Sequence, residues 1–237
     1  MKQQPLAIAF TPGEKWSYSG EAYSYLQAVV THLTGAHVDQ KVCGRFELGV
    51  EVCAAEPSID AFMQRNVFRP FGMTSSGLVW TDRIERNVAW GHDPKGEPLK
   101  TSRKPTAPAV ARYGAAGGLA TTPTDYAKFL VEVITPKQPD AFRLTRASLA
   151  EMLRPQVKLS ARRSWALGWT INHTTSGDII SHGGGNPGYS CFVAASVERK
   201  CGYAIMTNSE DTGFLEVIAK LISGDTLGNF LGAKLES

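Results

Sequence analysis

The sequence predicts an α+β protein in which an antiparallel sheet is flanked by helices and accompanied by a mostly helical region. Apolar residues recur at helical spacing within residues 10–155. From residue 163 onward the spacing changes to two, which is typical of strands with one buried face. Short turns join these strands, and this favours an antiparallel meander. We expect the 237 residues to form a single domain, with antiparallel strands and a C-terminal helix in residues 163–223.

Four helices are predicted in the first region, each from its own start or stop signal. Ser19 is a suitable N-cap and Gly35 a natural stop for the first helix. Ser58 caps a second helix, and Thr122, followed by proline and an acidic residue, opens a third. A short fourth helix is expected at 145–153. The apolar positions of the first helix are Tyr23, Leu26, Val29, Val30 and Leu33.

Three segments lack a helical period. We expect residues 36–57 to form an irregular insertion and residues 114–119 a loop of small residues. Residues 74–112, rich in proline, glycine, threonine and lysine, are predicted to be a long, loop-dominated excursion. A loop of this length is unusual unless it covers a site or carries short strands.

The strands follow from strict alternation. Residues 165–171 are predicted to form one strand, with Trp165 and Trp169 in the core. Residues 191–197 and 203–207 alternate in the same way, and residues 211–223 have the period of a helix.

Composition excludes several classes of function. The hydrophobic content of 43% and charged content of 20% are those of an ordinary globular protein. The formal charge of +3 is too small and dispersed to predict a nucleic-acid partner. No apolar run approaches the ~20 residues of a membrane span, and the first residues lack a signal-peptide core. The sequence as written therefore predicts a cytoplasmic protein, or a periplasmic or secreted one if an N-terminal segment is missing.

The cysteines predict neither a metal site nor a structural disulfide. No Cys-x-x-Cys pair occurs, and no histidine lies at metal-ligand spacing from a cysteine. A bridge between Cys43 and Cys53 remains conceivable, whereas Cys191 has the surroundings of a small buried residue. No cofactor is expected. The oligomeric state is left open.

The most informative stretch is residues 181–189, Ser-His-Gly-Gly-Gly-Asn-Pro-Gly-Tyr. Glycine lets a ligand approach the backbone N–H groups closely, and His182 adds a side chain that titrates near neutrality. This combination suits an acyl-transfer site in which an oxyanion must be bound. The structural alternative is a glycine-rich hairpin turn with a surface histidine.

Four segments resemble the serine β-lactamase and penicillin-binding-protein-like hydrolases, especially the branch of class C β-lactamases, D-alanyl-D-alanine carboxypeptidases and esterases. Residues 10–19 are similar to the family pattern F-x-P-G-x-x-x-x-Y-S, and residues 67–73 to P-L-G-M. Residues 116–125 resemble A-G-G-L-x-S-T-x-x-D. Residues 182–184 correspond to the third family motif, Lys-Thr-Gly in lactamases and often His-x-Gly in peptidases and esterases.

The resemblance implies a β-lactamase/transpeptidase-like fold acting on small-molecule ester, amide or peptide substrates. By analogy Tyr18 hydrogen-bonds the nucleophile and moves its proton, which requires a nearby positive charge because a phenol has a pKa of ~10. The N–H of Gly185 would form half of the oxyanion hole, and His182 would contact the substrate carboxylate or support Tyr18. The implied substrate-binding residues are Gly183, Gly184 and Asn186.

Two departures from the family pattern matter. The second motif, usually Tyr-x-Asn, is Tyr18-Ser19-Gly20 and lacks the amide side chain. No Ser-x-x-Lys occurs; the nearest approaches, at 160–163 and 196–199, carry arginine, which cannot serve as a proton carrier. Ser17 and Ser19 are rejected as substitute nucleophiles because neither is followed by a lysine at the Ser-x-x-Lys spacing.

We therefore expect the chain to be the C-terminal portion of the family fold, with the nucleophile-bearing helix preceding Met1. Two functions remain open. The first is a serine hydrolase that works through an acyl-enzyme. The second is a truncated or degenerate relative that binds a ligand or partner without catalysis.

Overall fold

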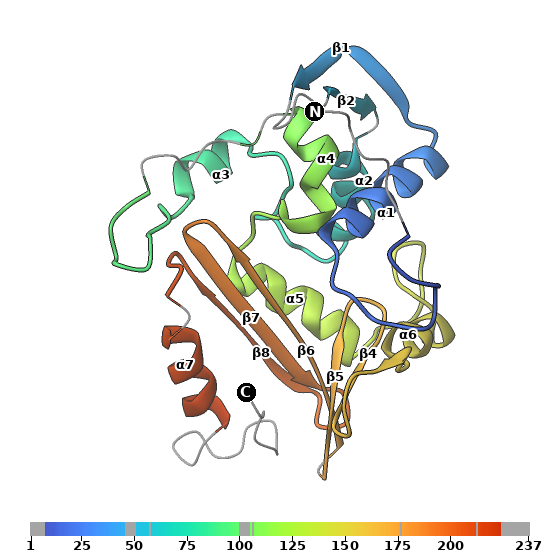
Figure 1. Cartoon of the computed structure of the whole chain (residues 1–237), viewed down its shortest axis with the longest axis vertical. Coiled ribbons are helices and arrows are strands. Elements are labelled where there is room, and N and C mark those ends of the chain that lie inside the picture. Colours follow the sequence, from blue (N-terminus) through green and yellow to red (C-terminus); the bar gives the residue numbers. More distant parts are fainter. Residues whose placement is uncertain are drawn as a thin grey trace. The chain divides into compact units, whose positions relative to one another are not determined.

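In this computed structural model the chain forms two compact units (Figure 1). The described residues are 8–45, 51–56, 58–99, 105, 107–175, 177–211 and 213–223. The first unit comprises Met1–Pro70, Thr74–Val88 and Arg103–Thr121. The second comprises Phe71–Met73, Ala89–Ser102 and Thr122–Ser237. The single domain expected from the sequence stays a prediction.

Short helices and a two-stranded sheet make up the first unit. The helical elements are α1 (Gly20–Leu33), α2 (Ile59–Met63), the π-helix η2 (Gln64–Phe68), α3 (Asp82–Asn87) and α4 (Ala107–Gly117). Ser19 and Ser58 cap α1 and α2 as predicted, each accepting a hydrogen bond from the N–H three residues later. The helix α4 occupies part of the expected excursion and of the expected small-residue loop, so both predictions were wrong there.

The helix α1 packs on α4 through polar groups. Gln27 is 3% exposed; its Nε2 donates to the carbonyls of Val110 (2.8 Å) and Ala111 (2.7 Å), and its Oε1 accepts from the N–H of Ala115 (2.7 Å). These bonds satisfy a buried amide that would otherwise be costly. The apolar positions that predict the helix are not its buried ones, since Leu26 is 51% exposed.

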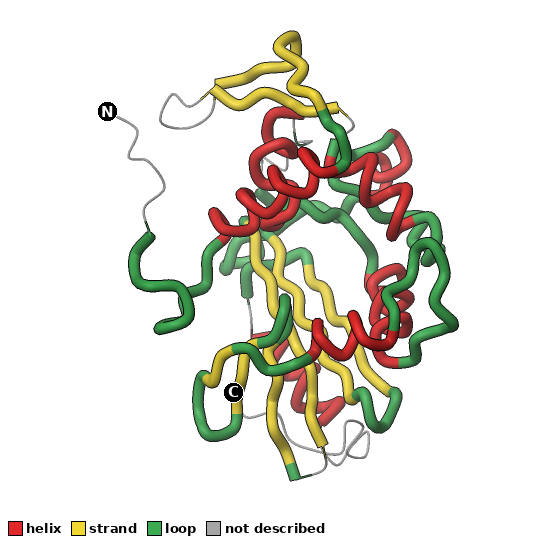
Figure 2. The backbone as a smooth tube through the Cα atoms, turned by 90° about the vertical axis from the view of Figure 1, so that its right-hand side faces the viewer, coloured by secondary structure: helices red, strands yellow, loops and turns green. Residues whose placement is uncertain are grey.

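Residues 36–57 were predicted to be irregular, and this was wrong. The strands β1 (His37–Arg45) and β2 (Glu51–Glu56) form an antiparallel pair whose register shifts between Asp39 and Cys43. The backbone of this pair, drawn in yellow at the top of Figure 2, lies against α4. The backbone register places Cys43 opposite Cys53, but their side chains lie outside the described residues.

The second unit confirms the predicted α+β class, with an antiparallel meander of six strands in sequential order. The strands are β3 (Val157–Lys158), β4 (Arg163–Trp165), β5 (Thr170–Thr174), β6 (Gly177–Asn186), β7 (Tyr189–Ser196) and β8 (Cys201–Thr207). The helices are α5 (Pro123–Ile134), α6 (Arg146–Leu153) and α7 (Gly213–Ser223). Of these, α5 and α7 each pack against β7 and β8 (Figure 1).

The predicted strand 165–171 is in fact the end of one strand, a turn and the start of the next. Gly168 has φ +84° and lets the chain reverse between β4 and β5. Leu167 in this turn is 54% exposed, while Trp169 is 4% exposed and belongs to the core. Trp165 is only half-buried. The apolar residues do alternate along 165–171, but the alternation continues through the turn and so does not reveal it.

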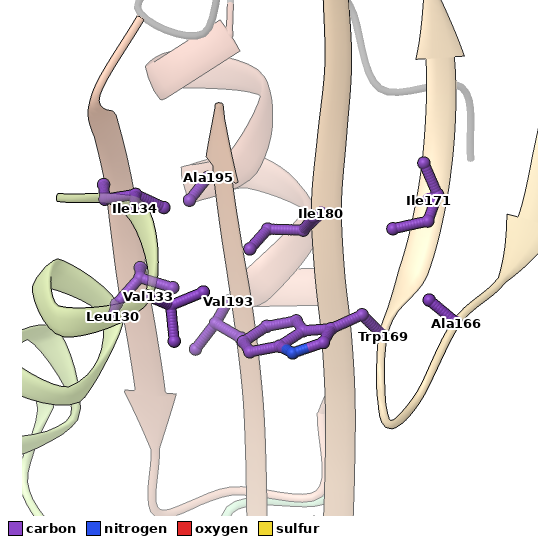
Figure 3. Close-up of a cluster of buried hydrophobic side chains, with 9 residues drawn as sticks. All are labelled: Leu130, Val133, Ile134, Ala166, Trp169, Ile171, Ile180, Val193 and Ala195. Atoms are coloured by element: carbon purple, nitrogen blue, oxygen red, sulfur yellow. The ribbon is translucent and has the colours of Figure 1, made fainter. Parts of the chain in front are cut away.

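One face of the sheet and α5 form the core of the second unit (Figure 3). Thr122 caps α5 as predicted and so fixes where its apolar side begins. Burial of each large apolar side chain contributes about 1.5–3 kcal/mol. The cluster consists of Leu130, Val133, Ile134, Ala166, Trp169, Ile171, Ile180, Val193 and Ala195.

Candidate active site

The predicted glycine-rich segment is not a loop but the exposed end of β6. Its first part, Ile179–Ser181, is buried, His182 is half-buried, and Gly183–Asn186 are exposed. The two-residue loop Pro187-Gly188 then leads into β7, with Asn186 opposite Tyr189. The candidate residues therefore lie on a strand that the core holds at one end.

The strand register fixes the direction of each N–H in this segment. A two-residue loop closes on a hydrogen-bonded pair, and such pairs alternate with non-bonded ones along an antiparallel ladder. The N–H groups of Asn186, Gly184 and His182 therefore point toward β7. A contact between the backbone of Gly184 and the thiol of Cys191, its partner on β7, agrees with this pattern.

Gly183 and Gly185 consequently direct their N–H groups to the other side of β6, where β5 would continue. The β5 register ends at Thr170, which pairs with Ser181. Among the described residues, no strand continues beside Gly183 or Gly185 on that side. Two exposed backbone donors on one strand edge are a suitable arrangement for binding an anion or a carbonyl oxygen.

Only one of the three consecutive glycines is needed for packing. A Cβ on Gly184 would lie 2.9 Å from Sγ of Cys191. On Gly183 the nearest atom would be Cδ2 of Phe192 at 3.6 Å, and on Gly185 the carbonyl oxygen of Tyr189 at 3.8 Å, both ordinary contacts. The absence of side chains at Gly183 and Gly185 therefore keeps their N–H groups accessible, while Gly184 allows the close approach of β7.

The ring of His182 lies edge-on to Trp165, with ring centroids 5.8 Å apart. This contact orients the imidazole from β4, which is separated from β6 by β5 in the sheet order. Burial raises the pKa of Cys191, with the Gly184 N–H opposing that effect, so the thiol stays protonated and is a poor nucleophile. Burial also raises the pKa of Tyr126 to about 12, which keeps its phenol neutral.

The segment 89–99, part of the predicted excursion, is bonded across the Pro187-Gly188 turn. The N–H of His92 donates to the carbonyls of Gly188 (3.3 Å) and Asn208 (2.9 Å), and the Tyr189 hydroxyl donates to the carbonyl of Ala89 (2.8 Å). Gly91 and Gly188 approach so closely that a Cβ on Gly188 would lie 2.7 Å from Cα of Gly91. We call residues 89–99 the strap. It fixes the turn at the end of β6.

An open pocket of about 370 Å³ lies at this end of the sheet. Besides the predicted Gly185 and Asn186, it contains Ser190 and Glu210, which the sequence reasoning missed. A meander brings the end of β8 beside the start of β7, as the pairing of Ser190 with Thr207 shows. Because Glu210 follows the end of β8 closely in sequence, its place near the β6–β7 turn could have been predicted from the meander. The full lining is Gly185, Asn186, Pro187, Tyr189, Ser190 and Glu210.

Tyr18 lies in the first unit, immediately before Ser19, the N-cap of α1. Its side chain is 61% exposed, and its ring centroid is 6.5 Å from that of Trp16. Burial, and secondarily the neighbouring Tyr18, raise the pKa of Tyr23. Because Tyr18 and the glycine-rich strand belong to different units, their predicted convergence on one site stays a prediction.

No metal-binding or membrane-spanning feature was found within the described residues. No three His, Cys, Asp or Glu side chains of this part gather as metal ligands would. Likewise, none of the described helices is both long and apolar enough to cross a bilayer.

The sheet, its helices and the edge-directed glycines define a β-lactamase-like α+β fold, and comparison with known families agrees. The profile of the Beta-lactamase family matches residues 2–223. The chain therefore belongs to the Beta-lactamase family. No curated protein sequence matches the chain.

Solved structures support the same fold. A penicillin-binding protein from Bacillus halodurans is similar with a TM-score of 0.64 and 17% identity, over 91% of this chain and 59% of that one. The octameric penicillin-binding protein homologue from Pyrococcus abyssi gives a TM-score of 0.62 and 20% identity, over 86% and 41%. D-amino acid amidase from Ochrobactrum anthropi SV3, complexed with D-phenylalanine, gives a TM-score of 0.58 and 19% identity, over 89% of this chain and 58% of that one. The chain thus spans roughly half the length of these structures.

Proposed function

We propose that this chain supplies the tyrosine and the oxyanion-binding strand of a β-lactamase-related serine hydrolase. Its substrates are esters or amides, including small peptides, which it cleaves through an acyl-enzyme. The nucleophilic serine lies outside these 237 residues, because they contain no Ser-x-x-Lys. In this scheme the serine attacks the substrate carbonyl, its proton passes to Tyr18, and the oxyanion accepts a hydrogen bond from the Gly185 N–H.

The observation that carries this proposal is the direction of the N–H groups at the end of β6. The loop and register turn the Gly185 N–H away from β7, toward a side with no continuing strand among the described residues. A pre-oriented backbone donor needs no reorganisation when charge develops on the substrate oxygen, and this is the basis of its catalytic value. Family membership and the histidine form of the third motif favour ester and amide hydrolysis.

The roles of the remaining site residues follow from their positions. Tyr18 acts as a proton carrier only beside a cation that favours its phenolate form, and the lysine of the missing motif would be that cation. His182, held edge-on by Trp165, contacts the substrate beside the edge donors. Gly20, the first residue of α1, stands where the family carries an asparagine, which weighs against true β-lactamase activity.

A second candidate function is a non-catalytic binding module, favoured by the absence of Ser-x-x-Lys within the chain. The edge donors and the pocket would then hold an acyl-type ligand without turning it over. Without a nucleophile, an acyl-enzyme site retains at most the weak catalysis of its oxyanion hole.

Labelling of the native protein, isolated as the cell makes it, separates the two functions. A fluorophosphonate probe reacts with activated serines, and peptide mapping locates the labelled residue. We expect the label on a serine followed three residues later by lysine, outside the 237 residues, with labelling lost in Tyr18→Phe. A label within the chain would overturn the assigned origin of the nucleophile. A folded protein that takes up no label would support the binding module.

Gly185→Pro and Gly185→Ala test the oxyanion donor as a matched pair. Proline removes the N–H at a position that donates to no neighbouring strand, so the ladder to β7 is retained. Alanine keeps the N–H, and its Cβ meets only the Tyr189 carbonyl oxygen at 3.8 Å. We expect Gly185→Pro to lower kcat by about 10²–10³-fold and Gly185→Ala by less than about tenfold. Equal losses in both variants would contradict the role of this N–H.

A further inference from the structure

The turn between β6 and β7 has a conformation that the twist of its two strands does not favour. The ring of Pro187 fixes its φ at about −65°. Gly188 has φ +84°, and this combination is that of a type II turn, which the order Pro-Gly favours locally. Two-residue hairpin loops are usually of type I′ or II′, because their twist matches that of the strands, whereas a type II turn splays them. The turn therefore depends on contacts from outside the hairpin.

Glu210, which follows β8, supplies such a contact. Its Oε1 accepts the N–H of Gly188 at 2.8 Å. Its own backbone N–H donates to the carbonyl of His92 at 3.1 Å, and the N–H of His92 donates to the carbonyl of Gly188 at 3.3 Å. These three hydrogen bonds form a closed ring that joins the turn, the strap and the segment after β8. The side chain of Glu210 is half-buried, and a carboxylate acceptor forms the stronger kind of hydrogen bond.

The N–H that Glu210 accepts belongs to the peptide that distinguishes one turn type from another. Types I and II differ by about 150–170° in ψ of the first central residue and in φ of the second, which amounts to a flip of the peptide between them. Here that peptide joins Pro187 to Gly188. Glycine adopts both signs of φ readily, so Gly188 itself does not prevent the flip. The flip would carry its N–H away from the carboxylate, so the bond to Glu210 holds the type II orientation.

The effect on the active site passes through the turn and not through direct contact. The Gly185 N–H points toward the β5 side of β6, whereas Glu210 follows β8, beyond β7. The turn closes on the pair Asn186 and Tyr189, and the next pair is Gly185 and Ser190. A glycine-rich strand has few side chains to fix its register, so the turn at its end has to provide that constraint.

We infer that Glu210 is a positioning residue for the oxyanion donor. Its carboxylate holds the central peptide of the turn, and the turn in this conformation holds the Gly185 N–H where the oxyanion forms. The catalytic part of this inference rests on the proposed function. The structural part, a hydrogen bond that controls the turn and the end of β6, can be measured without turnover.

Three variants of the 237-residue chain test the structural part by NMR. Glu210→Ala removes the acceptor, Glu210→Gln keeps one, and Glu216→Ala, which removes an exposed carboxylate on α7, is the matched control. We expect the Gly188 amide proton to exchange with water at least ~10-fold faster in Glu210→Ala, because it loses a hydrogen bond to a charged group. The Gly185 amide resonance should shift in the same variant. Glu210→Gln and Glu216→Ala should leave both signals close to those of the unaltered chain.

Two results in Glu210→Ala would overturn the inference. Unchanged exchange at Gly188 would mean that the carboxylate does not hold the turn. Faster exchange at Gly188 with an unmoved Gly185 amide would mean that the turn does not position the donor. Where Glu210→Ala does not fold, Glu210→Asp replaces it, since its carboxylate is one methylene shorter in reach, and it should give the same two changes.

Hydrolysis of p-nitrophenyl acetate by the native protein tests the catalytic part. We expect Glu210→Ala to lower kcat by about tenfold and to change KM by less than about twofold, because a misplaced donor weakens transition-state binding alone. Glu210→Gln should restore most of kcat. In Gly185→Pro the donor is already absent, so adding Glu210→Ala should lower kcat by less than about twofold more. Losses that multiply in the double variant would reject the positioning role.

The failure of this inference differs from the failure of the proposed function. A native protein that takes up no fluorophosphonate rejects the hydrolase, while the NMR result still decides whether Glu210 controls the end of β6. A labelled enzyme in which the two losses multiply upholds the hydrolase and rejects Glu210 as a positioning residue.

Discussion

The close contact between the strap and the β6–β7 turn predicts how much stability the chain loses when Gly188 is replaced by alanine. Gly188 has φ +84°, and a Cβ there would lie 2.7 Å from Cα of Gly91 and 2.7 Å from Cδ1 of Leu99. Gly188→Ala therefore adds backbone strain of ~1–2 kcal/mol and overpacking of ~1–3 kcal/mol. The lower entropy of the unfolded chain offsets about 0.4–1 kcal/mol. We expect a net destabilisation of about 2–4 kcal/mol.

A substitution at Gly96, in the same strap, separates the cost of backbone strain from the cost of overpacking. It also has φ +84°, but a Cβ there would have no atom within 4 Å. Gly96→Ala therefore introduces the strain without the overpacking, and we expect it to cost about 1 kcal/mol or less. The difference between the two variants measures the close approach of the strap to the turn.

Urea unfolding followed by circular dichroism measures both free energies of unfolding, and NMR of the Gly185 amide reports on the end of β6. The Gly188→Ala variant should lose stability and shift this amide, whereas Gly96→Ala should leave it in place. If Gly96→Ala costs as much as Gly188→Ala, the strap does not constrain the turn. If Gly188→Ala is neutral, the close approach itself is absent in solution.

Two further variants test the packing of the second unit. Trp169→Ala should cost ~3–5 kcal/mol in urea unfolding, because its ring is 4% exposed and stacks on Phe129 with centroids 6.4 Å apart; a loss below about 1 kcal/mol would place it outside the core. Glu132 accepts hydrogen bonds from Arg143 at 2.8 and 3.0 Å, and these lower the pKa of its carboxyl. A lowered pKa stabilises the fold above the unfolded value of ~4.3 and the effect fades as the pH falls through the folded value. Glu132→Gln should therefore destabilise at pH 7 by about 1–3 kcal/mol, with a deficit that shrinks in acid; a deficit independent of pH would contradict the ion pair.

Local signals in the sequence located the elements that depend on local chemistry. The caps at Ser19, Ser58 and Thr122 each use a hydroxyl and an N–H three residues apart, so short-range sequence determines them. The meander followed from strands separated by turns too short for a crossover. The glycine-rich segment was also found, although as a candidate turn and not as the end of a strand.

Features that depend on distant pairing were not predicted. The strands β1 and β2 stabilise each other by pairing across the sequence, and neither has a strong period of its own. The segment 165–171 alternates, but Gly168 turns it, and alternation alone does not distinguish a turn from a continuing strand. The strap needs the turn at Gly188 and the end of β8 as partners, which lie about a hundred residues away.

The proposed chemistry depends on the loop at Pro187-Gly188 as much as on the glycines before it. Because the loop has two residues, Asn186 faces Tyr189, and the period of two then turns the Gly185 N–H away from β7. A slip of one residue between β6 and β7 would direct that N–H into the ladder and expose the N–H of Gly184 instead. Glycine-rich strands resist such slips poorly, since they have no side chains to fix the register. The strap supplies the missing constraint. It leaves no room for a side chain at position 188, since a Cβ there would lie 2.7 Å from Cα of Gly91. The close contact between Gly91 and Gly188 therefore helps to set the orientation of the candidate oxyanion donor.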